Sequence, residues 1–411
     1  MLSINERVYD PFPLFKIHPL THLPKESGSS LMAHLYYNKH MDNPNSKRPT
    51  KWTRHQVILF SFVSVSLSFF VVLILLELVF TFLPVNEGLR TQDLHKSTPY
   101  LHFEKNRIST YSKGWNFKLK TLNRSNNYGY INNHDYLRES KTPLLSIIGD
   151  SYIEALMVNH EETLQGRLQR RLNQKARVYS FAASGAPLSQ YLNFAELATT
   201  KFQSNALIFV IISNDFDESL LRYKSAPGFY YFKENGKDLE LVRKDYKASL
   251  FVKLVRHSRL ARYLLVNLQI FNLVNRLFGE NQEYVANVAA NVDPKRLEDS
   301  KRAVDAFLKQ LLQMNGVQKE KLLFLVDGIR EEIYSEDSNP GSFFHKMRSY
   351  FLSRSKDHGI ESIDLHEVFE EDYLQSKKRF EFSEDAHWNG YAHGVVSKAV
   401  ENSRLYQSFL K

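Results

Sequence analysis

The sequence predicts an α/β fold, a three-layer sandwich with a mainly parallel sheet between two layers of helices, preceded by a single transmembrane helix. Two observations predict this fold. The run Val57–Leu76 carries no charge over 20 residues, and from Thr142 onward short apolar runs typical of buried strands alternate with segments of helical periodicity. Parallel strands need crossover connections, so this alternation favours a parallel sheet with helices on both faces.

We expect four segments along the chain. Residues 1–54 form a loosely ordered cytoplasmic tail, residues 55–85 the transmembrane helix, and residues 86–141 a juxtamembrane lead-in of short strands and loops. Residues 142–411 form the sheet-bearing domain, which an insertion interrupts at about residues 217–293. The histidines of the tail follow no metal-ligand spacing, so no metal is expected there.

The uncharged run is long enough to cross a bilayer, because about 20 apolar residues span the ~30 Å hydrocarbon layer. Four basic residues precede it: Lys47, Arg48, Lys51 and Arg54. No basic cluster follows it. The positive-inside bias therefore places residues 1–54 in the cytoplasm and residues 85–411 on the periplasmic side of the cytoplasmic (inner) membrane. Contact with the lipid bilayer is expected through residues 57–85, and Glu77 near the outer end is expected to reach the headgroups without any other role.

Five apolar runs after the lead-in predict strands: 144–148, 178–182, 206–213, 321–326 and 360–365. Helical periodicity predicts helices among them: 164–172, 297–314, 343–356 and a last helix that carries Tyr391, Val395, Ala399 and Val400. In an open parallel sheet the site lies beyond the carboxyl ends of the strands. Functional side chains are therefore expected in the segments that directly follow strands.

The insertion has two distinctive stretches. Its aromatic cluster, Phe229–Phe232, either packs within the insertion, which is the commoner role for such residues, or stacks on sugar rings. Its basic, leucine-rich segment, Leu250–Leu277, suits a protein partner or the membrane surface.

Composition excludes several classes of function. The chain has 411 residues and no cysteine, which rules out disulfide scaffolds, cysteine-ligated zinc, iron–sulfur clusters and thiol nucleophiles. Its net charge of +9 is partly concentrated before the apolar run and gives little support for nucleic-acid binding. Neither a Gly-x-x-x-x-Gly-Lys nor a Gly-x-Gly-x-x-Gly motif is present, so nucleotide binding is not indicated. No cofactor, metal or nucleic-acid partner is expected, and the sequence does not identify a protein partner.

Polar motifs follow the first three predicted strands. Gly149–Ser151 comes after the first, where a glycine permits a sharp turn and a serine hydroxyl is delivered at the edge of the sheet. Gly185 follows the second strand and offers an unobstructed backbone N–H. Asn214 follows the third and offers a side-chain amide. Each motif alone is common in turns and helix caps.

A fourth motif near the C-terminus changes the interpretation of the other three. Asp385 precedes His387 by two residues, which lets its carboxylate accept the ring N–H and leave the other ring nitrogen as a base. Together the four motifs supply a nucleophile, two oxyanion donors and an oriented base. Acyl transfer requires this combination.

The set resembles the SGNH (GDSL-type) hydrolase family over about residues 142–402, especially membrane-anchored bacterial members that read Asp-x-His-Trp-Asn before the final helix, here Asp385–Asn389. The resemblance implies that Ser151 is the nucleophile and that His387 is the general base, oriented by Asp385. It implies an oxyanion hole formed by the N–H groups of Ser151 and Gly185 and the side chain of Asn214.

Two positions depart from the family pattern. Ile212 stands where the third block usually has glycine, a change expected to narrow the site without removing a donor. Many members space the last pair Asp-x-x-His, and the residue three before His387 is Glu384. Glu384 is therefore the alternative to Asp385 as the orienting carboxylate.

The leading hypothesis for function is a serine-dependent O-acyl or O-acetyl esterase that acts outside the cytoplasmic membrane on an ester-bearing glycan such as an envelope polysaccharide. An O-acyltransferase to a surface glycan would use the same residues with a sugar hydroxyl as the acceptor. A non-catalytic glycan-binding or assembly component on a disabled hydrolase fold is the alternative from another class.

Overall fold

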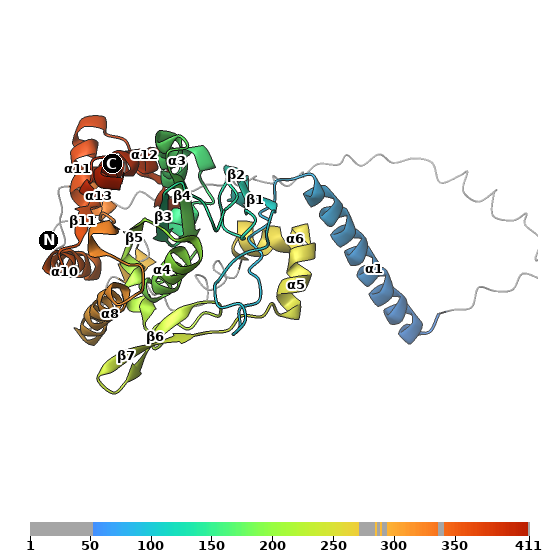
Figure 1. Ribbon diagram of the computed structural model, residues 1–411. Helices are drawn as coiled ribbons and strands as arrows, with labels where there is room; N and C mark the ends of the chain where they lie inside the picture. The colour runs from blue at the N-terminus through green and yellow to red at the C-terminus, as the bar shows by residue number, and fades with distance from the viewer. Residues whose placement is uncertain (1–51, 271–283, 286–287, 290–293, 336–340, 410–411) are drawn as a thin grey trace, which may run out of the picture. The chain divides into compact units, whose positions relative to one another are not determined.

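The computed structural model describes residues 52–270, 284–285, 288–289, 294–335 and 341–409 (Figure 1). The tail expected over residues 1–54 lies almost wholly outside the described residues. By its contacts the chain divides into two units, Met1–Ser66 and Leu67–Lys411. The second unit includes both the expected lead-in and the expected sheet-bearing domain.

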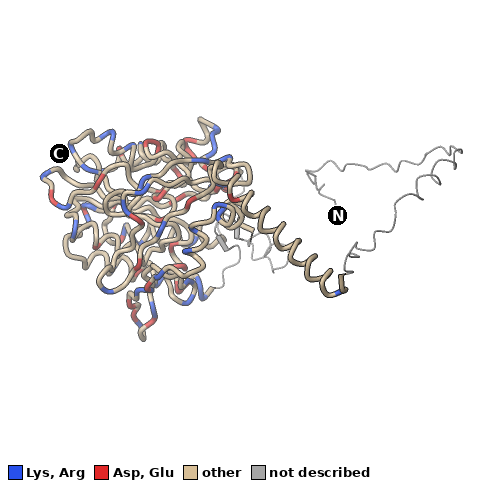
Figure 2. The backbone as a smooth tube through the Cα atoms, turned by 90° about the vertical axis from the view of Figure 1, so that its right-hand side faces the viewer, with Lys and Arg blue, Asp and Glu red and all other residues tan. Residues whose placement is uncertain are grey.

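The apolar run forms one helix, α1 (Arg54–Thr81), in which none of the 28 residues is buried. At 1.5 Å per residue it is about 42 Å long, enough to cross a bilayer. Figure 2 shows that Lys, Arg, Asp and Glu are absent from most of its length. Among the described residues it is the one helix long and apolar enough to span a membrane.

The centre of the second unit is a five-stranded sheet of β3 (Leu144–Gly149), β4 (Arg177–Ala182), β5 (Ala206–Ile211), β10 (Leu322–Val326) and β11 (Glu361–Asp364). All neighbouring strands are parallel, in the order β11-β10-β5-β3-β4. The order reverses direction at β3, which is the switch point of a doubly wound sheet. These strands lie where the five apolar runs predicted them.

Helices cover both faces of this sheet (Figure 1). One face is covered by α4 (Leu188–Phe202), α8 (Pro294–Leu312) and α10 (Phe343–Asp357). The other is covered by α3 (Leu164–Leu172), α11 (Leu365–Ser376), α12 (Gly390–Glu401) and α13 (Arg404–Phe409). Three short helices, α2 (Ser151–Glu154), α6 (Arg259–Arg262) and α9 (Arg330–Tyr334), lie at strand ends or in the insertion. The predicted α/β sandwich is confirmed.

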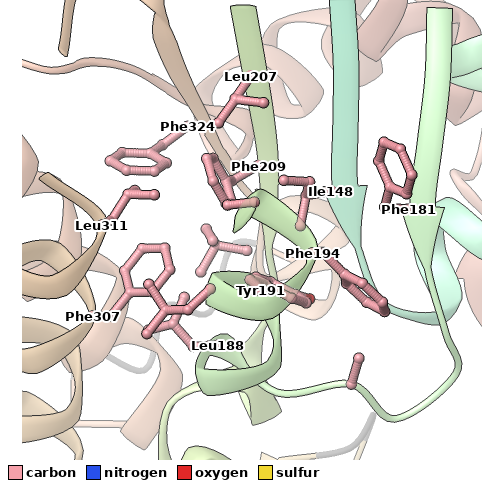
Figure 3. Close-up of a cluster of buried hydrophobic side chains, with 14 of the residues drawn as sticks. Ile148, Phe181, Leu188, Tyr191, Phe194, Leu207, Phe209, Phe307, Leu311 and Phe324 are labelled. Carbon is pink, nitrogen blue, oxygen red and sulfur yellow. The ribbon is translucent and has the colours of Figure 1, made fainter. Parts of the chain in front are cut away.

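Alternate residues of each strand enter different cores. Leu207 and Phe209 of β5 point to the α4–α8 side with Phe307 and Phe324 (Figure 3), whereas Ile208 belongs to the opposite core. Because side chains alternate along a strand, a continuous apolar run is the pattern of a strand buried on both faces. The apolar runs identified these strands for this reason.

Residues 86–141 contribute to the main core as well as linking the helix to it. A hairpin is formed by β1 (Ile108–Lys113) and β2 (Leu119–Arg124). Around it Leu101, Phe103 and Tyr136 are buried in the α4–α8 core, and the Tyr136 ring stacks on Tyr179 of β4 with centroids 3.8 Å apart. The lead-in therefore stabilises the edge of the sheet next to β4.

The insertion forms a hairpin of β6 (Tyr230–Asn235) and β7 (Asp238–Arg243), followed by α5 (Leu250–His257), α6 and one π-helical turn at Tyr263–Asn267. Two strands of two residues each, β8 (Tyr284–Val285) and β9 (Val288–Ala289), pair further along the chain. Tyr231 and Phe232 are fully buried, so packing accounts for half of the aromatic cluster. Much of the segment from 271 to 293 lies outside the described residues.

Candidate active site

The serine motif lies at the carboxyl end of β3, as predicted. Gly149 is needed there because a Cβ would lie 2.6 Å from Cγ1 of Ile153. Asp150 then caps α2, accepting a hydrogen bond from the Tyr152 N–H at 2.9 Å. This turn starts α2 at Ser151 and places the serine hydroxyl at the switch point of the sheet.

His387 and Asp385 lie on β13 (Asp385–Trp388), which pairs with the short strand β12 (Glu381–Phe382). His387 Nε2 is 2.8 Å from Ser151 Oγ, and the other ring nitrogen, Nδ1, contacts Asp385 Oδ1. The hydroxyl is also 3.0 Å from Asp150 Oδ2, so Nε2 is the nearer acceptor for its proton. Residues 236 positions apart in the chain thus form a continuous Ser–His–Asp arrangement.

The residues that flank His387 explain why β13 holds this position. Trp388 is fully buried, and its indole N–H donates to Asp327 Oδ1 at 2.9 Å. Asn389 caps α12 by accepting from the Ala392 N–H at 3.0 Å. The block Asp-x-His-Trp-Asn therefore combines two reactive groups with a core anchor and a helix cap.

Asp385 has two further partners besides His387. Lys113 Nζ on β1 lies 2.7 Å from its Oδ2, and the Tyr111 hydroxyl donates to the same oxygen at 3.4 Å. Burial tends to raise the pKa of this carboxyl, but the hydrogen bond and charge of His387, together with the Lys113 ammonium, hold the pKa well below its usual range. Asp385 is therefore ionised at neutral pH.

Glu384, the alternative orienting carboxylate, points elsewhere. It is exposed and pairs with Lys118 and with the Ser383 hydroxyl. The carboxylate that contacts the His387 ring is that of Asp385, whose side chain is only 2% exposed. The geometry places Asp385, rather than Glu384, beside the imidazole.

Arg330 connects the two halves of the arrangement. It is held by Asp327 at 2.8 Å, and its Nη2 donates to the Tyr152 hydroxyl at 2.7 Å and to the carbonyl oxygen of Ala386 at 3.1 Å. Tyr152 follows Ser151, and Ala386 lies between Asp385 and His387. One guanidinium therefore fixes the spacing between α2 and β13.

Two of the three expected oxyanion donors, Gly185 and Asn214, lie in loops that share partners. Gly185 follows β4 with φ +77°, a left-handed conformation that favours glycine, and its carbonyl accepts from Lys224 Nζ at 2.9 Å. Asn214 follows β5 and donates one amide hydrogen to Glu218 at 2.8 Å. Lys224 and Glu218 form an ion pair, so the two loops are tied together. The second amide hydrogen of Asn214 is not used in this contact.

Ile212 occupies the usual glycine position without strain. Its φ of −121° is accessible to any residue, and its side chain is buried in the α3–α12 core. Its N–H donates to Asp215 Oδ2 at 2.8 Å, and Asp215 also accepts from the Tyr191 hydroxyl at 3.0 Å. Burial raises the pKa of Asp215 well above its usual value. The turn after β5 is therefore fixed by a buried carboxyl, and no glycine is required for it.

A pocket of about 300 Å³ lies along α2 and the loop that precedes Gly185. Apolar side chains form much of its wall: Leu89, Leu101, Phe103, Leu156, Pro227 and Phe229. Its polar lining includes Glu154 and Ser184, which hydrogen-bond to each other. Burial raises the pKa of Glu154 to about 7, and its Oε1 has no hydrogen-bond partner. Glu154 is therefore a neutral carboxylic acid below that pH.

The residues singled out from the sequence are thus placed around one strand edge. Ser151, His387 and Asp385 are in contact, and Gly185 and Asn214 are joined through Lys224 and Glu218. Sequence reasoning missed Lys113, Tyr111 and Arg330, because nothing in their local sequence signals a contact with residues so distant in the chain. The fold is the one that the resemblance to SGNH/GDSL hydrolases implies.

No family model matches the chain, and no curated protein matches it. Among solved structures, it is similar to LAE5, an alpha/beta hydrolase enzyme from the metagenome of Lake Arreo, at 11% identity and a TM-score of 0.37, covering 67% of this chain and 99% of that one. A member of the lipolytic protein G-D-S-L family from Veillonella parvula matches at 12% identity and a TM-score of 0.30, covering 63% and 97%. A carbohydrate acetylesterase family member from Sinorhizobium meliloti matches at 9% identity and a TM-score of 0.33, covering 65% and 99%.

Proposed function

We propose that the protein is an SGNH-type serine esterase, anchored in the cytoplasmic membrane by α1, that removes acyl groups from an ester-bearing glycan on the outer side. The observation that carries the proposal is the hydrogen-bonded series Ser151 Oγ, His387 and Asp385, with Nε2 at 2.8 Å from the hydroxyl. A base oriented by a buried carboxylate and in contact with a serine hydroxyl is the arrangement of nucleophilic acyl transfer.

The chemistry proceeds in two halves. Ser151 Oγ attacks the ester carbonyl carbon and its proton passes to His387 Nε2. The bond from this carbon to the alcohol oxygen then breaks, and the imidazolium returns the proton to the leaving alcohol. Water next attacks the acyl-serine, gives its proton to His387 and releases the carboxylic acid as Ser151 recovers its hydrogen. Asp385 stays ionised throughout and stabilises the imidazolium.

The negative charge that develops on the carbonyl oxygen needs donors in place before the reaction. The N–H groups of Ser151 and Gly185 and the remaining amide hydrogen of Asn214 take this role. Loss of one such donor costs about 10²–10³ in rate in serine hydrolases. The ion pair of Lys224 and Glu218 positions both loops, because it bonds to the Gly185 carbonyl and to the Asn214 amide.

The charges that flank α1 support the proposed location. Basic residues precede the helix and no basic cluster follows it, which favours an outward-facing second unit. An ester on an envelope polysaccharide is accessible from that side. Because the chain contains no cysteine, Lys237→Cys in the β6–β7 turn supplies a unique thiol for testing this orientation. Labelling of intact spheroplasts by a membrane-impermeant maleimide is expected; labelling only after lysis would reverse the assignment.

The activity is tested first with a fluorophosphonate probe on the full chain in detergent. Wild type is expected to be labelled, Ser151→Ala to lose labelling, and His387→Ala to be labelled far more slowly. Ser376→Ala is the matched control, since this serine lies on α11 and bonds to Asp372. Well-folded wild type that resists the probe would refute the esterase and favour a non-catalytic component.

The glycan is tested in cells. Deletion of the gene is expected to raise the O-acyl content of envelope polysaccharide, and Ser151→Ala is expected to reproduce this increase. A fall in acylation would identify a transferase that uses the same residues. A phenotype on deletion that Ser151→Ala does not reproduce would favour the binding or assembly role.

A further inference from the structure

Helix α5 exposes an apolar face that no part of the described chain covers. Leu250, Phe251 and Leu254 are 79%, 60% and 71% exposed. They lie at positions i, i+1 and i+4 of an eight-residue helix and so share one side of it. Single exposed leucines are common, whereas three large apolar side chains together on one short helix indicate a binding surface.

The end of α5 is held beside the outer end of α1. Glu77 lies one residue beyond the uncharged run, and its carboxylate accepts hydrogen bonds from the Ser258 hydroxyl at 2.8 Å and from the N–H groups of Arg259 and Leu260 at 2.6 and 3.0 Å. Glu77 therefore caps the start of α6, which corrects the expectation that it only reaches the headgroups. Because 20 uncharged residues fill the hydrocarbon layer, this cap lies at the outer boundary of that layer.

The turn of the β1–β2 hairpin lies at the same level. The Tyr263 ring stands between Phe80 of α1, with centroids 4.5 Å apart, and Phe117 of the turn, at 5.5 Å. Its hydroxyl donates to the Trp115 carbonyl at 2.9 Å. The Trp115 side chain itself is 73% exposed. Tryptophan at the end of a membrane span is characteristic of the headgroup region.

The charge of this surface suits anionic lipid. Between Asp245 and Glu280 the sequence contains no acidic residue. Five basic residues lie in the described part of this stretch: Lys247, Lys253, Arg256, Arg259 and Arg262. Apolar side chains that insert and cations that meet headgroup phosphates are the two parts of an interfacial amphipathic helix.

We infer that the exposed face of α5 and the side chain of Trp115 insert into the outer headgroup region of the bilayer that α1 crosses, and so dock the second unit on the membrane surface. This inference rests on the membrane placement in the proposed function and is independent of the chemistry. A lipid surface is favoured over a protein partner because Glu77 already fixes α5 at the level of that surface.

Docking has a consequence for the substrate. Trp115 is two residues from Lys113 in the β1–β2 turn, and the Lys113 ammonium contacts Asp385 at 2.7 Å, so one hairpin connects the docking residue to the Ser–His–Asp arrangement. On this inference, docking favours an ester that is presented at the membrane surface.

Depth-dependent quenching tests the docking. A fluorophore on the single thiol of Leu254→Cys, in the full chain reconstituted into vesicles of phosphatidylcholine and phosphatidylglycerol, is expected to be quenched by lipids brominated in the upper part of the acyl chain. Leu374→Cys is the matched control, because Leu374 is 66% exposed and lies on α11, on the surface of the α3–α12 layer. Insertion by about 5–10 Å predicts at least about threefold stronger quenching at position 254 than at position 374.

Equal quenching at the two positions would overturn the inference. A label on Trp115→Cys is a second measurement, and we expect its quenching to match that at position 254. A Trp115→Cys label that brominated lipids do not quench would also count against docking. The two proposals fail separately, because fluorophosphonate labelling of the same samples reports the serine chemistry and resistance to alkaline extraction reports the span of α1.

Discussion

The contact between Lys113 and Asp385 makes a prediction about the pH dependence of the reaction. Lys113→Met keeps the length of the side chain and removes its charge. The ammonium and the imidazole of His387 lie on the two sides of one carboxylate, with Nζ at 2.7 Å from Oδ2 and the ring against Oδ1. Without the lysine, the Asp385 charge acts on His387 alone and attracts positive charge on the ring more strongly.

The size of the effect follows from the distance. Two like charges about 7 Å apart repel by about 2.4 kcal/mol at an effective dielectric constant of 20. The Lys113 side chain is 30% exposed, so solvent screens part of this interaction. About half of it, roughly 1.2 kcal/mol, corresponds to a shift of about one pH unit. The acid limb of the pH profile is therefore expected to move upward by about one unit.

The assay is the second-order rate of fluorophosphonate labelling between pH 5 and 9, measured on full-length protein in detergent. Lys118→Met is the matched control, since Lys118 on the same hairpin pairs with the exposed Glu384 and is expected to leave the profile in place. Circular dichroism verifies that each variant is folded. A Lys113→Met profile that superimposes on wild type would refute the electrostatic role of the lysine.

Three further outcomes are expected. Asp385→Asn lowers the labelling rate by about 10³–10⁴, whereas Glu384→Gln changes it less than about twofold; a large loss from Glu384→Gln would reassign the orienting carboxylate. Burial raises the pKa of Glu154 from 4.5 to about 7, so ionisation costs stability as the pH rises through that interval, by about 3 kcal/mol at pH 8. In urea unfolding, the free energy of unfolding of Glu154→Gln should therefore increase relative to that of wild type between pH 5 and pH 8. The same difference in free energy at pH 5 and at pH 8 would contradict the burial effect. Ile212→Gly removes a buried side chain from a position with ordinary backbone geometry, so it should lower the free energy of unfolding by about 3–5 kcal/mol without raising the labelling rate of the folded protein; faster labelling would show that Ile212 obstructs the site.

The sheet and its reactive edge were predictable because the physics is local. A strand buried on both faces needs a continuous apolar run, which is why β5 and β10 were evident from their sequences alone. Parallel strands bring their carboxyl ends to one edge, so Ser151 and Asn214 were expected there. His387 could be assigned to the same site because Asp385, two residues away, is close enough to orient its ring.

What the sequence did not indicate depends on tertiary packing. Lys113 and Arg330 stand in ordinary polar surroundings in the sequence, and only the folded chain brings them to Asp385 and Tyr152. The lead-in has no clear periodicity, yet its Tyr136 stacks on Tyr179 and enters the core. In the sequence, Glu77 looks like any carboxylate at the end of a span, and only the fold places the start of α6 beside it.

The pairing of Lys113 with Asp385 also determines when the site can assemble during translation. The two residues are 272 positions apart, and Lys113 lies on β1, the first strand after α1. At about 5–20 residues per second, the ribosome needs roughly 15–50 s to supply the second after the first. During that interval Lys113 on β1 has no Asp385 to pair with, and Ser151 has no His387 beside it. A chain that ends before residue 385 therefore contains the serine but neither the carboxylate nor the imidazole that contact it in the folded protein.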